Sequence, residues 1–173
     1  MSDAAGKSDK STPPTRVADV ARRPGLIRSQ ARLAAVQALY QMDLASTDVN
    51  KLIHEFVTER FGAEAEDETV AMADQNLFEA IVRGVVANQR EIDPAVDAQL
   101  AVGWRLNRLD ATLRAILRGA MYEILYRPDT PARVVITEYL DIAKAFFDGE
   151  EPKVTNAVLD KLARKHRAPE FGG

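Results

Sequence analysis

The segment Leu113–Leu125, LRAILRGAMYEIL, indicates the fold class most clearly. Its apolar residues recur at the spacing i, i+3, i+4, i+7 and i+11, which places them on one face of an α-helix. These residues are Leu113, Ile116, Leu117, Ala120 and Ile124. Asp110 is suited to cap the start of this helix, and Pro128 disfavours helical geometry in the residue before it. The sequence therefore predicts a helix that begins after Asp110 and ends before Arg127.

Helical periodicity extends from this segment in both directions, and no segment shows sustained strand alternation. We predict an all-α protein of about seven helices, in two packed helical-bundle subdomains. Four of the other six predicted helices cover residues 27–45, Asp93–Val102, Thr130 to about Phe147, and Lys153–His166. The remaining two begin after the caps Asp48 and Asp74. Pro94 would lie in the first turn of its helix, and Thr130 would cap the helix that Pro131 begins.

The predicted domain boundaries follow composition. Residues 1–25 are polar and proline-containing and read as a disordered basic arm, residues 26–168 as the folded domain, and residues 169–173 as a tail. The two subdomains are expected at about 26–91 and 92–168, and the acidic stretch Gly62–Thr69 is predicted to be a loop. Without an apolar core, the first 25 residues do not resemble a signal peptide.

Composition excludes several classes of function. Of the 173 residues, 46% are hydrophobic and 28% are charged, with no apolar run of the length that crosses a bilayer, so we expect no membrane span. The cysteine count of zero excludes disulfides, thiolate metal sites and cysteine nucleophiles, and is compatible with a cytoplasmic location. His54 and His166 have no partners at ligand spacing, and nucleotide-binding loops and nucleophile motifs are absent. We therefore expect a protein that is not an enzyme and has neither cofactor nor metal.

Charge is unevenly distributed along the chain. Residues 1–33 contain seven basic and three acidic side chains, whereas residues 54–79 contain eight acidic side chains and one basic. A basic arm on an acidic body suits a polyanion, although a terminal segment that is merely polar would show a similar composition.

Candidate recognition residues lie at helix starts and on helix faces. Arg28, Gln30 and Arg32 begin the first helix, where arginine can bind phosphates or stack on bases. Tyr40 could stack on an unpaired base or pack in the core. Arg114, Arg118 and Tyr122 share one face of the central helix, which an ordinary solvated face would also explain.

Lys153 and Asn156 open the last helix, where free backbone N–H groups favour an anion. The resulting hypothesis is one cationic surface, which includes Arg28, Arg32 and Lys153 and holds single-stranded nucleic acid. Asn156 could instead cap or bridge helices.

Four strings, in order, resemble the NusB family of transcription antitermination factors. They are RLAAVQALYQMDL (Arg32–Leu44), LRAILRGAMYEIL (Leu113–Leu125), VVITEYLDIAKAF (Val134–Phe146) and NAVLDKLAR (Asn156–Arg164), and the resemblance covers about residues 27–167. By this resemblance, Arg28 and Arg32 correspond to the arginine-rich start of the family pattern, and Tyr40 to the tyrosine of its first helix. Arg118 corresponds to the arginine of its central helix, and Lys153 and Asn156 to its usual lysine-phenylalanine-valine-asparagine-glycine stretch. Ser29 and Gln30 interrupt the arginine run, while Val154 and Ala157 stand where the family usually has phenylalanine and glycine.

The resemblance implies a factor that binds boxA-type single-stranded RNA together with NusE, a small-subunit ribosomal protein. It would join RNA polymerase and suppress termination, chiefly in ribosomal RNA operons. Two alternatives stay open: a helical protein–protein adaptor that binds no RNA, and the detached RNA-binding domain of an RNA cytosine methyltransferase. A homodimer that covers the start of the first helix is left open as well.

Overall fold

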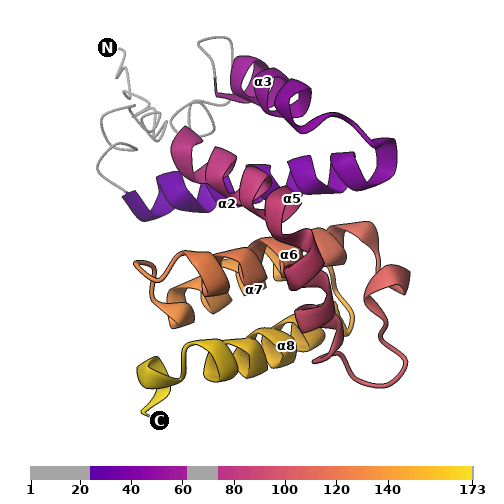
Figure 1. Cartoon of the computed structure of the whole chain (residues 1–173), viewed down its shortest axis with the longest axis vertical. Helices are drawn as coiled ribbons and strands as arrows, with labels where there is room; N and C mark the ends of the chain where they lie inside the picture. Colours follow the sequence, from indigo (N-terminus) through magenta and orange to yellow (C-terminus); the bar gives the residue numbers. More distant parts are fainter. Residues whose placement is uncertain (1–23, 62–73, 173) are drawn as a thin grey trace, which may run out of the picture.

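The computed structural model describes residues 24–61 and 74–172, and every regular element in these ranges is helical (Figure 1). The all-α prediction is confirmed, with six α-helices and two short 3₁₀ helices in the described part. The α-helices are α2 (Pro24–Ala45), α3 (Val49–Arg60), α5 (Gln75–Asp97), α6 (Ala111–Tyr126), α7 (Ala132–Phe146) and α8 (Glu151–His166). The 3₁₀ helices are η1 (Leu106–Arg108) and η2 (Ala168–Phe171). Residues 1–23 of the predicted arm and the predicted loop Gly62–Thr69 lie outside the described residues.

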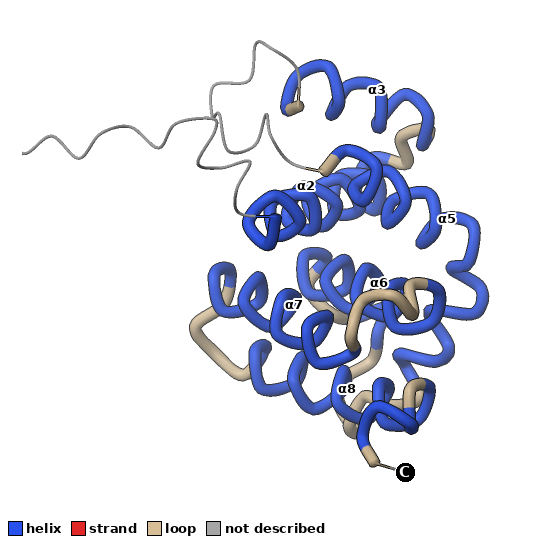
Figure 2. Tube along the Cα trace, turned by 90° about the vertical axis from the view of Figure 1, so that its left-hand side faces the viewer, coloured by secondary structure: helices blue, strands red, loops and turns tan. Residues whose placement is uncertain are grey.

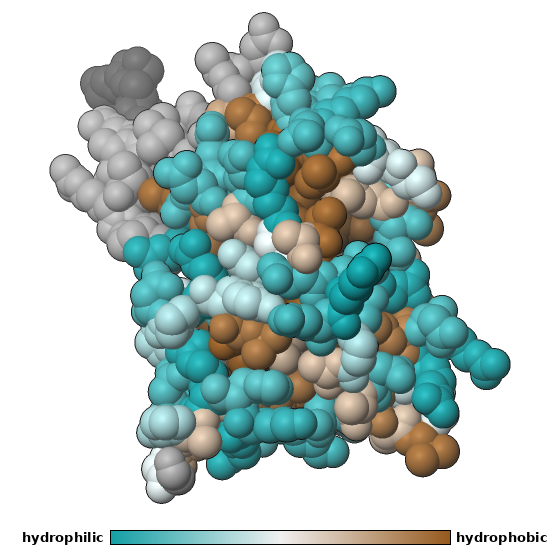
Figure 3. Space-filling model, in the orientation of Figure 1, coloured by the Kyte–Doolittle hydropathy of each residue, from teal (hydrophilic) through white to brown (hydrophobic). Residues whose placement is uncertain are grey.

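The helices are arranged in two groups joined by α5. α2 and α3 lie on one side, α6, α7 and α8 stack on the other, and α5 runs between the groups (Figures 1 and 2). α5 packs against α2, α3 and α6, and one hydrophobic core includes residues from all six α-helices. The boundary expected near residues 91 and 92 falls inside α5, and the division into two subdomains stays a prediction. On the face shown in Figure 3, hydrophilic residues predominate and hydrophobic residues show in patches between them.

The central helix α6 begins and ends where the sequence predicts. Asp110 is its N-cap and accepts a hydrogen bond from the backbone N–H of Thr112 at 2.8 Å, while Arg127 is its C-cap. The five apolar residues of the predicted stripe are all buried. The predicted caps Asp48 and Asp74 are confirmed too, since each accepts a hydrogen bond from the backbone N–H three residues on.

α2 approaches α6 and α5 closely because its buried face is built mainly from alanine. Ala31, Ala34, Ala35 and Ala38 are all buried, and the larger Tyr40 and Leu44 are turned outward. Pro24 opens the helix, a position where its missing N–H costs no intrahelical hydrogen bond.

The helix predicted over Asp93–Val102 has the wrong bounds. α5 continues through Pro94 and ends at Asp97, and helical geometry is interrupted earlier, at Asn88 (φ −116°, ψ 15°). The Asn88 side-chain amide donates to the carbonyl of Gly84 at 2.8 Å, which gives a backbone acceptor at the bend a side-chain partner. Pro94 therefore lies within a bent helix and does not start a new one.

The cap predicted for α7 is wrong by one residue. Pro131 occupies the N-cap position and has no side-chain acceptor, so the helix start is satisfied from elsewhere in the chain. Glu170 accepts a hydrogen bond from the backbone N–H of Ala132 at 2.9 Å. Residues 169–171, predicted as part of a tail, belong to η2. This segment is fixed further because Glu170 pairs with Arg167, and because Phe171 lies against Arg133 and Arg164.

The guanidinium of Arg167 links this segment to the end of α6. It donates to the backbone carbonyls of Thr130 at 2.8 Å and Pro128 at 3.2 Å. The turn between α6 and α7, which contains two prolines, is thereby held by a side chain some 40 residues away.

We predict that Glu170 makes stability depend on acidic pH. Its hydrogen bond from the Ala132 N–H and its pairing with Arg167 lower the pKa of Glu170 below its ordinary value of 4.5. The contribution is therefore complete above pH 4.5 and is lost as pH falls through the lowered pKa. Urea unfolding between pH 7 and pH 3 should show Glu170→Gln less stable than the parent at neutral pH, with the difference shrinking in acid. Glu150→Gln, at an exposed carboxylate whose partner Lys153 is 3.9 Å away, is the control and should show no such trend.

Candidate nucleic-acid interface

Arg32, expected at the surface, lies inside the protein. Its side chain is 2% exposed, and Nε and Nη2 donate to the two carboxylate oxygens of Glu123 at 2.9 Å each. A buried guanidinium needs a bidentate partner of this kind, because an unpaired charge in the interior is strongly unfavourable. The expectation that Arg32 reaches a phosphate does not fit this position, since its fork is occupied by Glu123.

The Arg32–Glu123 pair is surrounded by further polar groups from α2 and α7. Ser29 donates to Glu138 at 2.7 Å, and Glu138 lies 3.9 Å from Nη1 of Arg32. Burial alone would lower the pKa of Arg32, but the hydrogen bonds and charge of Glu123 outweigh it and the pKa is raised. Burial, and then the negative charge of Glu123, raise the pKa of Tyr139 well above its usual value, so its hydroxyl stays neutral. The group is a structural junction of α2, α6 and α7.

Arg28 and Gln30 lie in the first turns of α2, with Arg28 exposed and Gln30 partly exposed. Twelve residues separate Arg28 from Tyr40, which is roughly 18 Å along a helix axis. These two side chains are therefore at the opposite end of α2 from the features described next.

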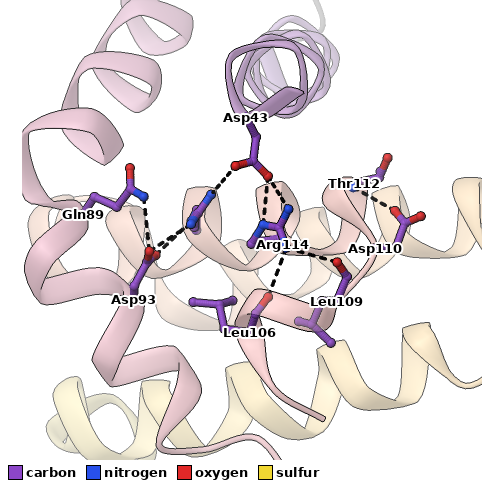
Figure 4. A network of polar contacts seen from close by, with 9 residues as sticks. Asp43, Gln89, Asp93, Leu106, Leu109, Asp110, Thr112 and Arg114 are labelled. Carbon is purple, nitrogen blue, oxygen red and sulfur yellow. Dashed lines mark hydrogen bonds and ion pairs between the residues drawn. The ribbon is translucent and has the colours of Figure 1, made fainter. Parts of the chain in front are cut away.

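An arginine-rich groove of about 970 Å³ lies where the last turn of α2 meets the end of α5 and the start of α6 (Figure 4). We call it the arginine groove; its charged residues are Arg105, Arg108, Arg114, Arg118, Asp43, Asp93 and Asp97. Three different helices and η1 contribute to it, so only the folded chain brings these residues together.

The inner part of the arginine groove is an ion-pair network. Arg118 donates to both carboxylate oxygens of Asp93, at 2.8 and 2.9 Å, and its Nη1 lies 3.6 Å from Asp43. Arg114 pairs with Asp43 and donates through Nη1 to the carbonyls of Leu106 and Leu109, at 3.2 and 3.1 Å. Arg114 and Arg118 are therefore not an ordinary solvated face of α6.

Tyr122, expected on the same face as these arginines, is buried instead. Its ring packs directly against Gly84 of α5: a Cβ atom on Gly84 would lie 2.0 Å from Tyr122 Cε2. The arginine–arginine–tyrosine stripe of the sequence thus splits, with the arginines in the groove and the tyrosine in the core.

Arg105 and Arg108 form the exposed part of the arginine groove. The Arg105 side chain is 72% exposed and lies 3.7 Å from Asp97, and Arg108 is exposed, with no ion pair among the described residues. Neither residue was predicted from the sequence, because neither belongs to an amphipathic helix. The sequence feature that could have indicated them is two arginines three residues apart, with the buried Leu106 between them.

A second, apolar groove of about 500 Å³ is formed by α2, α3, the start of α6 and the end of α7. We call it the apolar groove; its lining includes Val36, Tyr40, Leu44, Phe56, Thr112 and Phe146. Tyr40, Leu44 and Phe146 are 39%, 62% and 47% exposed, so three large apolar side chains reach the surface in one groove, as at many interaction sites. Of the two roles left open for Tyr40, full burial in the core is therefore excluded.

Phe146 is a candidate contact that sequence analysis missed. Phe146 is the last residue of α7, and Phe147 is its C-cap, with extended backbone geometry. Phe147 is partly buried against the core, whereas Phe146 is 47% exposed.

The two grooves adjoin. On α2, Asp43 lines the arginine groove and the next residue, Leu44, lines the apolar groove. On α6, Arg114 lines the arginine groove and Thr112, two residues before it, lines the apolar groove. α8 begins at Glu151, a few residues after Phe146, which brings the exposed Lys153 and Asn156 to this end of the molecule. Lys153 has a single exposed partner, Glu150, at 3.9 Å.

The residues predicted from the sequence therefore separate into three places. Tyr40, Arg118, Lys153 and Asn156 lie at one end, Arg28 and Gln30 lie at the other end of α2, and Arg32 is buried. The hypothesis of one cationic surface shared by Arg28, Arg32 and Lys153 is wrong. Arg28 lies at the start of α2, and the length of α2 separates it from the end of the molecule where Lys153 lies. Arg32 is buried and paired with Glu123. Contact of the individual residues with RNA stays a prediction.

No group of three or more histidine, aspartate or glutamate side chains in the described ranges is placed to hold a metal ion. None of the described helices is long and apolar enough to span a bilayer.

Comparison with known proteins gives one family. A model described as "NusB family" matches residues 29–164. The chain is 54% identical over 145 residues to the transcription antitermination protein NusB of Maricaulis maris, covering 84% of this chain and 91% of that protein. It is 51% identical over 140 residues to the protein of the same name from Sinorhizobium fredii, covering 81% and 88%. Its fold matches the solved structure of T. maritima NusB with a TM-score of 0.69 and 28% identity, over 84% of this chain and 97% of that one.

We predict that the buried Arg32–Glu123 pair is sensitive to the loss of one partner only. Arg32→Met leaves Glu123 buried without its countercharge and should lower the free energy of unfolding by about 3–5 kcal/mol. Arg32→Met combined with Glu123→Leu removes both charges and should recover most of that loss. Urea unfolding followed by circular dichroism measures both effects.

The exposed pair Arg164–Asp160 provides the control: Asp160→Asn leaves Arg164 against Phe171 and should cost no more than about 1 kcal/mol. A double variant as unstable as Arg32→Met alone would contradict this account of the pair.

Proposed function

The chain belongs to the NusB family, and from this premise we propose that it binds boxA-type single-stranded RNA together with NusE, a small-subunit ribosomal protein. We further propose that this complex joins RNA polymerase and suppresses termination, chiefly in ribosomal RNA operons. The chain is a transcription antitermination factor and not an enzyme, as its match to the family over residues 29–164 establishes. A cytoplasmic location would follow from a role in transcription.

The proposed RNA contact rests on the exposed side chains at the end of the molecule that holds both grooves. Tyr40 and Phe146 present partly exposed rings in the apolar groove, where unpaired bases could stack. Lys153 supplies a cation and Asn156 an amide at the start of α8. Arg28 and Gln30, at the far end of α2, would contribute only to a longer RNA or through general attraction.

The proposed protein contact rests on the same groove. Val36 and Phe56 of its lining are buried, whereas Leu44 and Phe146 are 62% and 47% exposed. A partner that covers these side chains removes apolar surface from water, which favours association. With the RNA and NusE in contact over one surface, each would strengthen binding of the other, typically by about 1–3 kcal/mol.

The comparisons favour this interpretation over the two alternatives. The relatives matched over about nine-tenths of their length carry the antitermination name, which gives no support to a detached methyltransferase domain. An adaptor that binds no RNA would use the same apolar groove, and the RNA titration below separates the two. Pairing of two copies stays a prediction.

We predict that Tyr40 contributes to RNA affinity by stacking. Removing its ring in Tyr40→Ala should weaken binding of a labelled boxA RNA by about 1–3 kcal/mol, measured by fluorescence anisotropy with and without NusE. Tyr126→Ala is the matched control, because Tyr126 is 38% exposed on α6 and lies outside both grooves. Equal affinity of the parent protein for boxA RNA and for a scrambled RNA, in both conditions, would contradict the proposed function.

We also predict that NusE docks on the apolar groove. Leu44→Asp places a charge on its apolar lining, which should weaken NusE binding at least tenfold in isothermal titration calorimetry. Val134→Asp, at a 42% exposed position in the first turn of α7, should leave NusE affinity within twofold. Unchanged affinity in Leu44→Asp would place the ribosomal protein on another surface.

A further inference from the structure

We propose that the arginine groove is a second RNA contact, which binds the phosphate backbone of single-stranded RNA that continues beyond the segment held at the apolar groove. This inference rests on the proposed function and adds to it a site of different chemistry. The ligand class is the sugar–phosphate backbone, bound without regard to base sequence.

The charges of the arginine groove are paired in its inner part and mostly unpaired in its exposed part. Four arginines and three aspartates line the arginine groove, so cations exceed carboxylates by one. Arg114 and Arg118, whose side chains are mostly buried, form ion pairs with Asp43 and Asp93. Arg105 keeps only a 3.7 Å contact with Asp97, and Arg108 has no ion pair in the described part of the chain. The free positive charge is therefore concentrated on the exposed side.

Arg105 and Arg108 lie on a backbone segment that is held in place by buried residues and hydrogen bonds. Arg105 is the N-cap of η1 and Arg108 its last residue, and in a 3₁₀ helix residues three apart lie on the same side. Leu106 and Leu109 are buried beneath them, and the Leu106 N–H donates to Asp97 at 3.0 Å. Arg114 holds the carbonyls of the same two leucines from below. Two guanidinium groups are thus presented together, and little backbone ordering is needed when a ligand binds.

The chemistry of the lining fits a phosphate backbone. A guanidinium fork matches phosphate oxygens, and the lining of the arginine groove contains no aromatic ring on which a base could stack. A site with arginines and without stacking surfaces fits the backbone of a nucleic acid better than its bases. The two grooves flank the crossing of the last turn of α2 with the first turn of α6, so a single strand that leaves one groove reaches the other by passing over this crossing.

The inner arginines have a positioning role in this proposal. Asp43 and Asp93 orient Arg114 and Arg118, which in turn hold η1 and the end of α5 in place. Arg118 Nη1 makes no hydrogen bond within the described ranges, which leaves one inner donor for a phosphate that enters deeply.

The test compares two RNAs on the full chain in the presence of NusE. One is a short boxA RNA, and in the other the same RNA carries a single-stranded oligouridine extension on either side. Anisotropy titrations over a range of salt concentrations give the affinity and its salt dependence. For the parent protein, we expect the extended RNA to bind about tenfold more tightly and with a steeper salt dependence.

The double variant Arg105→Gln/Arg108→Gln should bind the short RNA as the parent does and lose the gain from the extension. Its log–log salt slope for the extended RNA should fall by roughly 1.4, since each lost contact to a single strand changes the slope by about 0.7. Arg90→Gln/Lys161→Gln removes the same charge from exposed positions outside the groove and should retain the gain.

Each other outcome decides against the inference. If the extension adds no affinity, or if the Arg105/Arg108 variant keeps the added affinity, the arginine groove is not an RNA contact, while the proposed function stands on the short RNA. If the control variant loses the gain equally, the effect is general attraction and not this groove. If neither RNA binds, both the proposed function and this inference fail.

Discussion

The buried ion pair between Arg32 and Glu123 is the interaction on which the arrangement of the helices depends. It joins α2 to the central helix α6 with two hydrogen bonds of 2.9 Å, in a region from which water is excluded. Such a pair contributes more to specificity than to net stability, because only one relative position of the two helices satisfies both charges. Ser29 and Glu138 extend the junction to α7. The alanine face of α2 then allows the close contact that the pair requires.

The position of both grooves follows from that junction. Fixing α2 on α6 brings the last turn of one helix over the first turn of the other, with Asp43 against Arg114. The arginine groove opens on one side of this crossing and the apolar groove on the other. One end of the molecule thereby offers charge and apolar surface next to each other, a combination suited to a nucleic acid and a protein bound together.

The contrast between local and distant partners at helix ends explains which helix boundaries were predicted correctly. The caps Asp48, Asp74 and Asp110 act through hydrogen bonds to backbone N–H groups two or three residues away, so the local sequence contains all the information needed. The ends of α5 and α7 depend on more distant groups. α5 bends at Asn88 and continues through Pro94, and Glu170, far along the chain, replaces the cap that Thr130 was expected to provide.

By itself, the sequence determined that the protein is all-α, where most of its helices lie, and that its strings belong to the NusB family, since periodicity and local motifs are properties of contiguous residues. It also identified Tyr40, Lys153 and Asn156 as candidate contacts. Only the tertiary structure decided which arginines are available to a ligand. Arg32 and Arg108 are the same residue type with the same charge. Arg32 is neutralised by Glu123, which is 91 residues away along the chain, whereas Arg108 is exposed and has no ion pair among the described residues. Pairing between residues so far apart depends on how helices pack, which helical periodicity does not specify.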